Sequence, residues 1–196
     1  MKRDETTRER ALNGLVQLVD QDPEIKNEVT MLLWTQFYPK LVTCELKTIR
    51  ALAHEVTCKF ISLWGKKISK FLKDLIPLLM SGLYDPETYV VKAASQSITS
   101  VFNSVEKIEA LWEKFIPEHC KLIHEVLLIE SKDTISDEKF VSKAESNAKY
   151  TRLVTTCTFI MVHLLKKYPT LVLQQSNYLE TLHAENLWFS LRFESS

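Results

Sequence analysis

The sequence predicts an all-α protein, and three observations carry this prediction. Its 196 residues include only three glycines and six prolines, too few for the many turns of a β-rich fold. Apolar residues make up 45% of the chain and recur at helical spacing along most of its length. The pattern repeats about every 40 residues, a period typical of stacked helix pairs, so we expect about eight helices in antiparallel pairs.

The clearest helix pair runs from Lys66 to Ser95. Its first helix is predicted to end at Gly82. A turn at Asp85 and Pro86 follows, where Asp85 is expected to cap the second helix and Pro86 to occupy its first position. Each helix carries one apolar stripe. These stripes consist of Ile68, Phe71, Leu72, Leu75, Ile76 and Leu79 in the first helix and Val90, Ala94, Ile98, Val101 and Phe102 in the second.

Three helices are predicted before this pair. The first covers residues 4–20 and is closed by Asp22 and Pro23. The second covers residues 24–43, and the third runs from Cys44 to Trp64 and stops at Gly65, a residue suited to positive φ. The expected buried residues are Leu12, Leu15, Leu18 and Val19 in the first helix, and Val29, Leu32, Leu33, Phe37 and Leu41 in the second, with Trp34 and Tyr38 widening that stripe.

Residues after the pair continue the helical pattern with one interruption. A long amphipathic segment over residues 105–130 is expected to kink at Pro117, which cannot donate a backbone hydrogen bond. The polar stretch over residues 131–145 predicts a surface loop with a short helix from Asp137. The helical pattern resumes near Glu145, and a last helix is predicted to begin near Ser176.

An alanine-bearing motif recurs in the second helix of successive pairs. It reads Arg8-Glu9-Arg10-Ala11, then Ile49-Arg50-Ala51-Leu52-Ala53, then Val91-Lys92-Ala93-Ala94. With a proline inside the first helix and an Asp-Pro turn, this pattern resembles a HEAT repeat, and it predicts a HEAT/armadillo-like α-solenoid. We expect a single domain over residues 1–196, excised from a longer solenoid, because the ends lack the polar caps of a complete array.

Composition limits where the protein works. No stretch approaches the roughly 20 apolar residues that a membrane-spanning helix needs, and the N-terminus has no apolar signal core. A soluble, cytoplasmic protein is therefore expected. The four cysteines have no CxxC spacing, which favours buried, reduced thiols over a zinc site or disulfides.

The sequence gives little support for a catalytic site. His119 and His124 are five residues apart, which places them about 140° apart on a helix and is wrong for a helical zinc pair. His54 precedes Cys58 by one turn, but nothing in the sequence orients the imidazole as a base. We predict no enzymatic activity, metal or cofactor for this segment.

Charge is unevenly distributed although the formal net charge is zero. The segment from Lys40 to Asp74 contains eight basic and three acidic residues, whereas residues 106–145 contain ten acidic and six basic ones. Lys66, Lys67, Lys70 and Lys73 form a dense cationic cluster that could neutralise the phosphates of RNA. A solvated helix face is the alternative explanation.

Short stretches, in order along the chain, resemble the listerin family of RING-type E3 ubiquitin ligases, which act in ribosome-associated quality control. Lys2-Arg3-Asp4-Glu5-Thr6-Thr7, followed by Glu9-Arg10-Ala11-Leu12, is similar to the family's KRDxTTxxKAL, with Arg10 in place of lysine. Asp133-Thr134-Ile135-Ser136-Asp137 is similar to its DTxSD loop, and Tyr150 and Arg152 fit its YxR. The run from Lys66 to Pro77 resembles fungal members in particular.

The resemblance implies a non-enzymatic docking domain. It would bind the large ribosomal subunit that carries a stalled peptidyl-tRNA, near the co-factor that senses this tRNA, while a remote zinc-bearing RING recruits the E2. The candidate binding residues are Lys2, Arg3, Thr6, Thr7, Lys66, Lys67, Lys70, Lys73, Asp133, Thr134, Ser136 and Asp137. The threonines could instead only cap a helix, and the aspartates only stabilise their own loop. The alternative function is a generic HEAT-repeat scaffold or transport adaptor that binds protein partners on its concave face.

Overall fold

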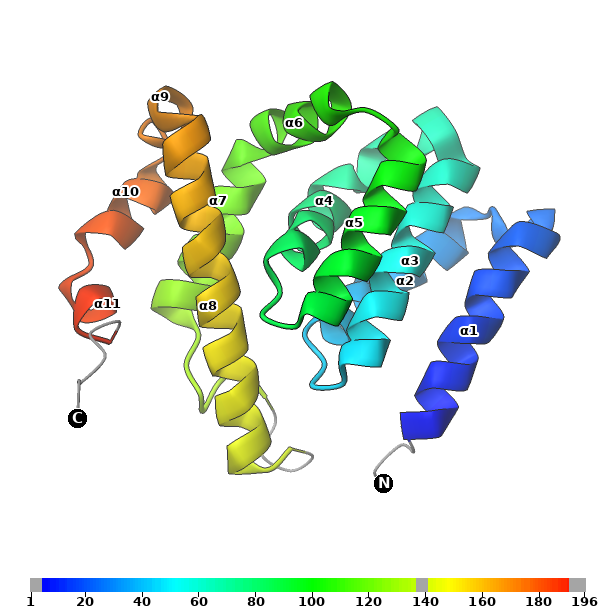
Figure 1. The fold of residues 1–196 in the computed structure, drawn as a ribbon, viewed down its shortest axis with the longest axis horizontal. Coiled ribbons are helices and arrows are strands. Elements are labelled where there is room, and N and C mark those ends of the chain that lie inside the picture. Colours follow the sequence, from blue (N-terminus) through cyan, green and yellow to red (C-terminus); the bar gives the residue numbers. More distant parts are fainter. Residues whose placement is uncertain (1–4, 137–140, 191–196) are drawn as a thin grey trace. The chain divides into compact units, whose positions relative to one another are not determined.

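The computed structural model describes residues 5–136 and 141–190, and within these ranges the chain is helical and contains no strand (Figure 1). The all-α prediction is confirmed. The chain divides into two compact units, Met1–Lys114 and Phe115–Ser196, which are described separately. The single domain over residues 1–196 and the HEAT assignment of its helix pairs stay predictions.

The first unit contains six α-helices and three 3₁₀ segments within its described residues. They are α1 (Glu5–Gln21), η1 (Pro23–Ile25), α2 (Glu28–Val42), α3 (Lys47–Trp64), η2 (Gly65–Phe71), α4 (Leu72–Ser81), η3 (Gly82–Tyr84), α5 (Thr88–Phe102) and α6 (Val105–Lys114). Asp22 and Pro23 close α1 as predicted, and the Asp22 carboxylate accepts a hydrogen bond from the Glu24 amide.

Helix α3 is the centre of this unit. It packs against α1 and α5 on its two sides and also against α2 (Figure 1). Ile49, Ala53, Val56 and Phe60 are fully buried along it. The predicted stripe of α5 is confirmed at its centre, where Val90, Ala94 and Ile98 are buried.

The predicted stripe of α2 is wrong at four positions. Val29, Leu32, Leu33 and Phe37 are at least half exposed. Trp34 and Tyr38, which were expected to widen the stripe, are buried, together with Met31 and Val42. Leu18 of α1, also predicted to be buried, is 43% exposed.

Polar partners explain which face of α2 is buried. Trp34 Nε1 donates a hydrogen bond to Thr57 Oγ1 at 3.0 Å, and the Tyr38 hydroxyl is hydrogen-bonded to His54 Nδ1 at 3.0 Å. The two rings stack with their centroids 5.7 Å apart. Phe37 on the exposed face has no polar atom to pair, whereas Trp34 and Tyr38 bury large rings whose polar atoms are satisfied, so their face is the buried one.

The predicted cap at Asp85 is also wrong. Helix α5 begins at Thr88 rather than Pro86, and its N-cap position is Glu87. The Asp85 carboxylate accepts a hydrogen bond from the Glu87 amide and forms an ion pair with the buried Arg50. Asp85 therefore stabilises the turn and binds Arg50 of α3, but it is not the N-cap of α5.

The second unit begins where a kink was expected. The segment over residues 105–130 breaks into two helices between Lys114 and Ile116, with Pro117 in the first turn of the second one. Its described elements are α7 (Ile116–His124), the π-helical η4 (Glu125–Ile129), α8 (Lys143–Lys167), α9 (Pro169–Val172), α10 (Ser176–His183) and α11 (Glu185–Ser190). Helix α7 packs on α8 and α10.

Two details of this unit bear on the sequence predictions. A capping box of Ser142 and Glu145 starts α8 two residues earlier than expected. The short helix predicted from Asp137 falls outside the described residues. The break at Phe115 and the short helices near the C-terminus give more segments than the eight expected. No described helix is both long and apolar enough to cross a bilayer.

Candidate functional site

The four candidate lysines follow a sharp end of α3. Gly65 adopts φ +53°, as its position after the helix predicted, and the chain continues as the 3₁₀ segment η2. Ile68 and Phe71 are buried from this segment. In a 3₁₀ helix, residues three apart lie in line, so these two anchors hold one side of η2 against the core.

The same geometry aligns the lysines. Lys67 and Lys70 are three residues apart and exposed, which places them in one row about 6 Å apart at a 3₁₀ rise of about 2 Å per residue. Lys66 is exposed on the neighbouring side of η2, and Lys73 is exposed in the first turns of α4.

These lysines differ in their partners. Lys70 forms an ion pair with Glu28 of α2, and its Nζ lies 5.1 Å from the centre of the Phe71 ring. Within the described ranges, Lys66 and Lys67 have neither an ion-pair nor a hydrogen-bond partner. The structure thus leaves two adjacent ammonium groups available to an external anion.

The predicted opening motif is described only in part. Lys2 and Arg3 lie outside the described residues. Thr6 and Thr7 are exposed in the first turn of α1, which begins at Glu5. They belong to the same unit as the lysines, but α1 packs on α3 whereas η2 lies against α3 and α4.

The candidate loop belongs to the second unit. Thr134 Oγ1 donates a hydrogen bond to Glu130 at 2.7 Å and accepts one from the Ser131 amide at 2.8 Å, so its side chain holds the loop together. Two groups of α8 also bind the loop backbone: Ser146 donates to the Lys132 carbonyl, and Lys149 donates to the Ile135 carbonyl.

The side chains of the other candidate residues in this loop do not stabilise the loop in this way. The Asp133 side chain is exposed. The Ser136 hydroxyl is buried without a hydrogen-bond partner in the described part of the chain, beside a cavity of about 120 Å³ that Asp133 also lines. Asp137 lies outside the described residues.

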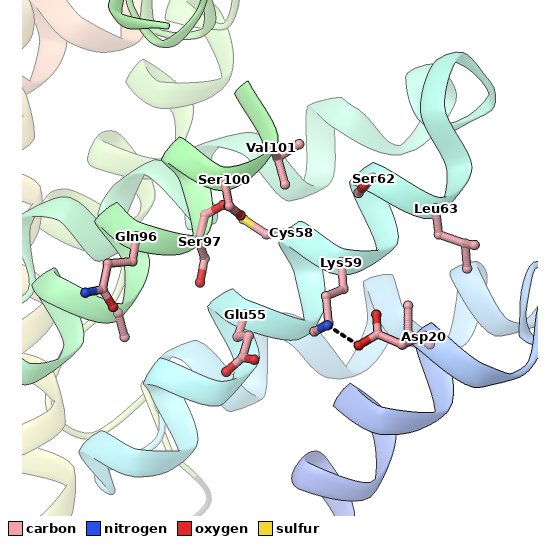
Figure 2. Close-up of a pocket in the computed structure, with 12 residues that line it drawn as sticks. Asp20, Glu55, Cys58, Lys59, Ser62, Leu63, Gln96, Ser97, Ser100 and Val101 are labelled. Atoms are coloured by element: carbon pink, nitrogen blue, oxygen red, sulfur yellow. Dashed lines mark hydrogen bonds and ion pairs between the residues drawn. The ribbon is translucent and has the colours of Figure 1, made fainter. Parts of the chain in front are cut away.

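One surface groove was missed in the sequence. Residues of α1, α3 and α5 line a cavity of about 700 Å³ (Figure 2). Asp20 and Lys59 form an ion pair across it at 2.5 Å, and Glu55, Ser97 and Ser100 add polar groups. The available signal was the spacing of Glu55, Lys59 and Ser62 along one side of α3.

The thiol in this groove is not poised for catalysis. Burial and, to a smaller extent, the Glu55 carboxylate raise the pKa of Cys58 to about 12, so the thiolate is scarce at neutral pH. Burial lowers the pKa of His54 to about 4, and its Nδ1 is engaged by Tyr38. The suggested His54 and Cys58 pair thus lacks an activated nucleophile.

The second histidine cluster does not converge on a metal position. His119 and Cys120 are buried in α7, whereas His124 Nε2 is 3.0 Å from a carboxylate oxygen of Glu180. Among the described residues, no group of three or more histidine, cysteine or acidic side chains is arranged to hold a metal ion.

Comparison with known proteins identifies the family. The profile of the family "E3 ubiquitin-protein ligase listerin, N-terminal domain" matches residues 1–196. The chain is 35% identical over 200 residues to E3 ubiquitin-protein ligase listerin of Saccharomyces cerevisiae, covering all of the chain and 13% of the relative. Listerins of Neurospora crassa and Schizosaccharomyces pombe are 27% and 28% identical over 84% and 85% of the chain.

The match also shows how these residues relate to the longer proteins. The chain spans 13% of the yeast relative and 10% of each of the other two. The family profile covers the chain from its first residue to its last, including the opening motif, the lysines and the loop. The chain belongs to the listerin N-terminal domain family.

Proposed function

We propose that this domain docks a listerin-type E3 ubiquitin ligase on the large ribosomal subunit that carries a stalled nascent chain. One observation carries the proposal: Lys66 and Lys67, exposed on the 3₁₀ segment η2, have no partner among the described residues. Clustered cations of this kind bind phosphates by releasing counterions. The chain belongs to the listerin N-terminal domain family, and its longer relatives are named E3 ubiquitin-protein ligases, so the ligase activity is assigned to the longer protein.

The domain acts by positioning rather than by chemistry. Ubiquitin transfer belongs to a remote RING, which holds the zinc and recruits the E2, whereas this segment brings that RING close to the nascent chain in the cytoplasm. Holding two reactants on one particle raises their effective concentration. The partners of the domain are ribosomal RNA, ribosomal proteins and the co-factor that senses the stalled peptidyl-tRNA.

Co-sedimentation with purified large subunits across a salt series tests the proposal. Neutralising the two lysines in Lys66→Gln/Lys67→Gln removes two phosphate contacts and lowers the steepness of log K against log salt by roughly 1.5, since each contact contributes about 0.7–0.9. Lys92→Gln/Lys166→Gln is the matched control, because both lysines are exposed at other places and the change in charge is the same. The proposal fails if the wild-type chain does not sediment at low salt, or if the lysine variant behaves like the control.

The groove of α1, α3 and α5 favours a second candidate, a scaffold that binds protein segments (Figure 2). Its mixed carboxylate, amide and hydroxyl lining suits an extended polypeptide. Binding that is insensitive to salt and to the two lysines, but is lost in Glu55→Lys/Gln96→Lys, would favour this candidate over ribosome docking.

A further inference from the structure

Ser69 lies within the lysine cluster, which consists of Lys66, Lys67, Lys70 and Lys73. The Ser69 side chain is exposed, and its hydroxyl has no hydrogen-bond partner within the described ranges. Its backbone is engaged, because the Ser69 carbonyl accepts a hydrogen bond from the Leu72 amide. The side-chain oxygen is therefore open to solvent and to an enzyme that modifies it.

The residues before Ser69 distinguish it from every other serine and threonine of the sequence. Lys66 and Lys67 stand three and two positions before it, and no other hydroxyl residue of the 196 residues has basic residues at both of these positions. Protein kinases with an acidic substrate groove select their acceptor serine by such basic residues, through charge complementarity. Ser69 thus carries the charge pattern of a kinase acceptor.

The 3₁₀ form of η2 places this hydroxyl among the ammonium groups. Residues three apart lie in line, so Ser69 follows Lys66 in one row, about 6 Å further along at a rise of about 2 Å per residue. Lys67 and Lys70 form the neighbouring row, and Lys73 follows in the first turn of α4. A phosphate on Ser69 is therefore within side-chain reach of cations in both rows.

We propose that a kinase that recognises basic residues before its acceptor phosphorylates Ser69, and that this phosphate prevents the lysine cluster from binding RNA; the inference rests on the proposed docking function. The kinase transfers the γ-phosphoryl group of ATP to Ser69 Oγ. A P–O bond forms at this oxygen, the bond between the γ-phosphorus and the β,γ-bridging oxygen breaks, and ADP and the hydroxyl proton leave. The phosphoserine carries a charge of about −1.5 to −2 at pH 7 and pairs with the neighbouring lysines.

The added charge is large compared with the charge of the cluster. The four lysines contribute four positive charges, and Glu28 pairs with one of them, Lys70. The phosphate therefore lowers the net charge of these five side chains from +3 to about +1 to +1.5. Each lost RNA phosphate contact lowers the salt slope by about 0.7–0.9, so the loss of two contacts weakens binding about tenfold or more at 0.1 M salt.

Access of the kinase to Ser69 requires a local opening of η2, because a kinase binds its acceptor segment in an extended conformation. Gly65, at φ +53°, separates η2 from α3, so the opening is confined to η2 and leaves the hydrogen bonds inside α3 intact. It must release the buried Ile68 and Phe71. The folded chain should therefore be phosphorylated more slowly than a peptide of residues 64–73, but at the same serine.

Treatment with ATP and the catalytic subunit of cyclic-AMP-dependent protein kinase, which recognises basic residues before a serine, tests the proposal. Mass spectrometry should find the phosphate at Ser69 of the folded chain and none at this position in Ser69→Ala. The phosphorylated chain should then bind labelled poly(U) RNA and purified large subunits about tenfold or more weakly than the unmodified chain at 0.1 M salt. Ser69→Asp, with a single negative charge, should weaken both about fivefold, whereas Ser95→Asp, at an exposed serine of α5, should weaken neither.

The two binding assays separate failure of this inference from failure of ribosome docking. If the folded chain takes up no phosphate at Ser69, or if the phosphate leaves binding to poly(U) and to large subunits unchanged, the inference is wrong and docking stands. If the unmodified chain binds poly(U) but not large subunits, docking is wrong, and the effect of the phosphate on poly(U) binding still decides whether it blocks the lysine cluster. Absence of both kinds of binding would refute both proposals.

Discussion

Arg50 and Asp85 form a bidentate ion pair inside the first unit. Arg50 Nε lies 2.7 Å from Asp85 Oδ2, and Arg50 Nη2 lies 3.0 Å from Asp85 Oδ1. Only 1% of the Arg50 side chain and 9% of the Asp85 side chain are exposed. Arg50 Nη1 also donates to the carbonyls of Cys44 and Glu45. One guanidinium therefore joins the turn before α3 to the turn before α5.

Replacing Asp85 by alanine should reduce the free energy of unfolding by about 3–5 kcal/mol, because it leaves the buried Arg50 charge without its partner. Urea unfolding followed by circular dichroism measures this loss. Asp20→Ala is the control, since Asp20 pairs with Lys59 but is 59% exposed, and such pairs contribute at most about 1 kcal/mol. Equal losses in the two variants would contradict the assigned role of the buried pair.

Gly82→Ala should be destabilising by about 1–3 kcal/mol, the usual cost of overpacking a core. A Cβ at this position would lie 2.6 Å from His54 Nε2 and 2.9 Å from the Ala94 Cβ. Gly14→Ala is the opposite control, because nothing lies within 4 Å of its added Cβ and helical alanine is better than glycine by about 0.5–1 kcal/mol. In thermal unfolding experiments, the melting temperature should fall for Gly82→Ala and rise for Gly14→Ala.

Lowering the pH should reduce the free energy of unfolding of the first unit, because His54 is buried there. Burial, partly offset by Asp85 and reinforced by Arg50, lowers the pKa of His54 to about 4. The unfolded chain takes up the proton at its ordinary pKa of about 6.5, so the stabilisation is complete above that pH. As the pH is lowered from 6.5 to 4, this contribution to the free energy of unfolding decreases by about 1.4 kcal/mol per pH unit.

Urea unfolding at pH 7.5, 6 and 5 checks this loss, and the ring protons of His54 in the native chain should titrate near pH 4. His119 adds a similar loss in the second unit, because burial and, to a smaller extent, His163 lower its pKa to about 3. His183→Gln, a change at an exposed residue, should leave the slope unaltered. A flat profile between pH 7 and 5 would refute the assignment.

Three of the four thiols should resist alkylation in the native state. Burial raises the pKa of Cys58, Cys120 and Cys157 to about 12, whereas Cys44 is only half-buried. Brief treatment with iodoacetamide should therefore modify Cys44 alone, and all four thiols should react in urea. Mass spectrometry of tryptic peptides gives the answer, and rapid native labelling of Cys58 would revive the idea of a reactive thiol.

The sequence predicted most of the fold because apolar spacing and turn residues act locally. Gly65 ended α3 with positive φ, and Val90, Ala94 and Ile98 form the buried stripe of α5. Four positions of α2 were predicted wrongly because counting apolar residues gives no weight to the hydrogen bonds of Trp34 and Tyr38, which decide the buried face. Those partners, Thr57 and His54, belong to another helix, and a single helix cannot reveal them.

The candidate site was predictable to a smaller extent. The lysines stood out as a charge cluster, but their alignment depends on the 3₁₀ form of η2, which the α-helical spacing of their apolar neighbours concealed. Asp85 was recognised as a turn residue, whereas its pairing with Arg50, 35 positions away, depends on tertiary packing.

The distance between Arg50 and Asp85 along the chain matters during synthesis. At about 5–20 residues per second, the 35 residues that separate them take about 2–7 s to translate. During that interval Arg50 has emerged or is emerging without its counter-ion, and α3 lacks the helix that covers one of its sides. The first unit can therefore close only once α5 has left the ribosome.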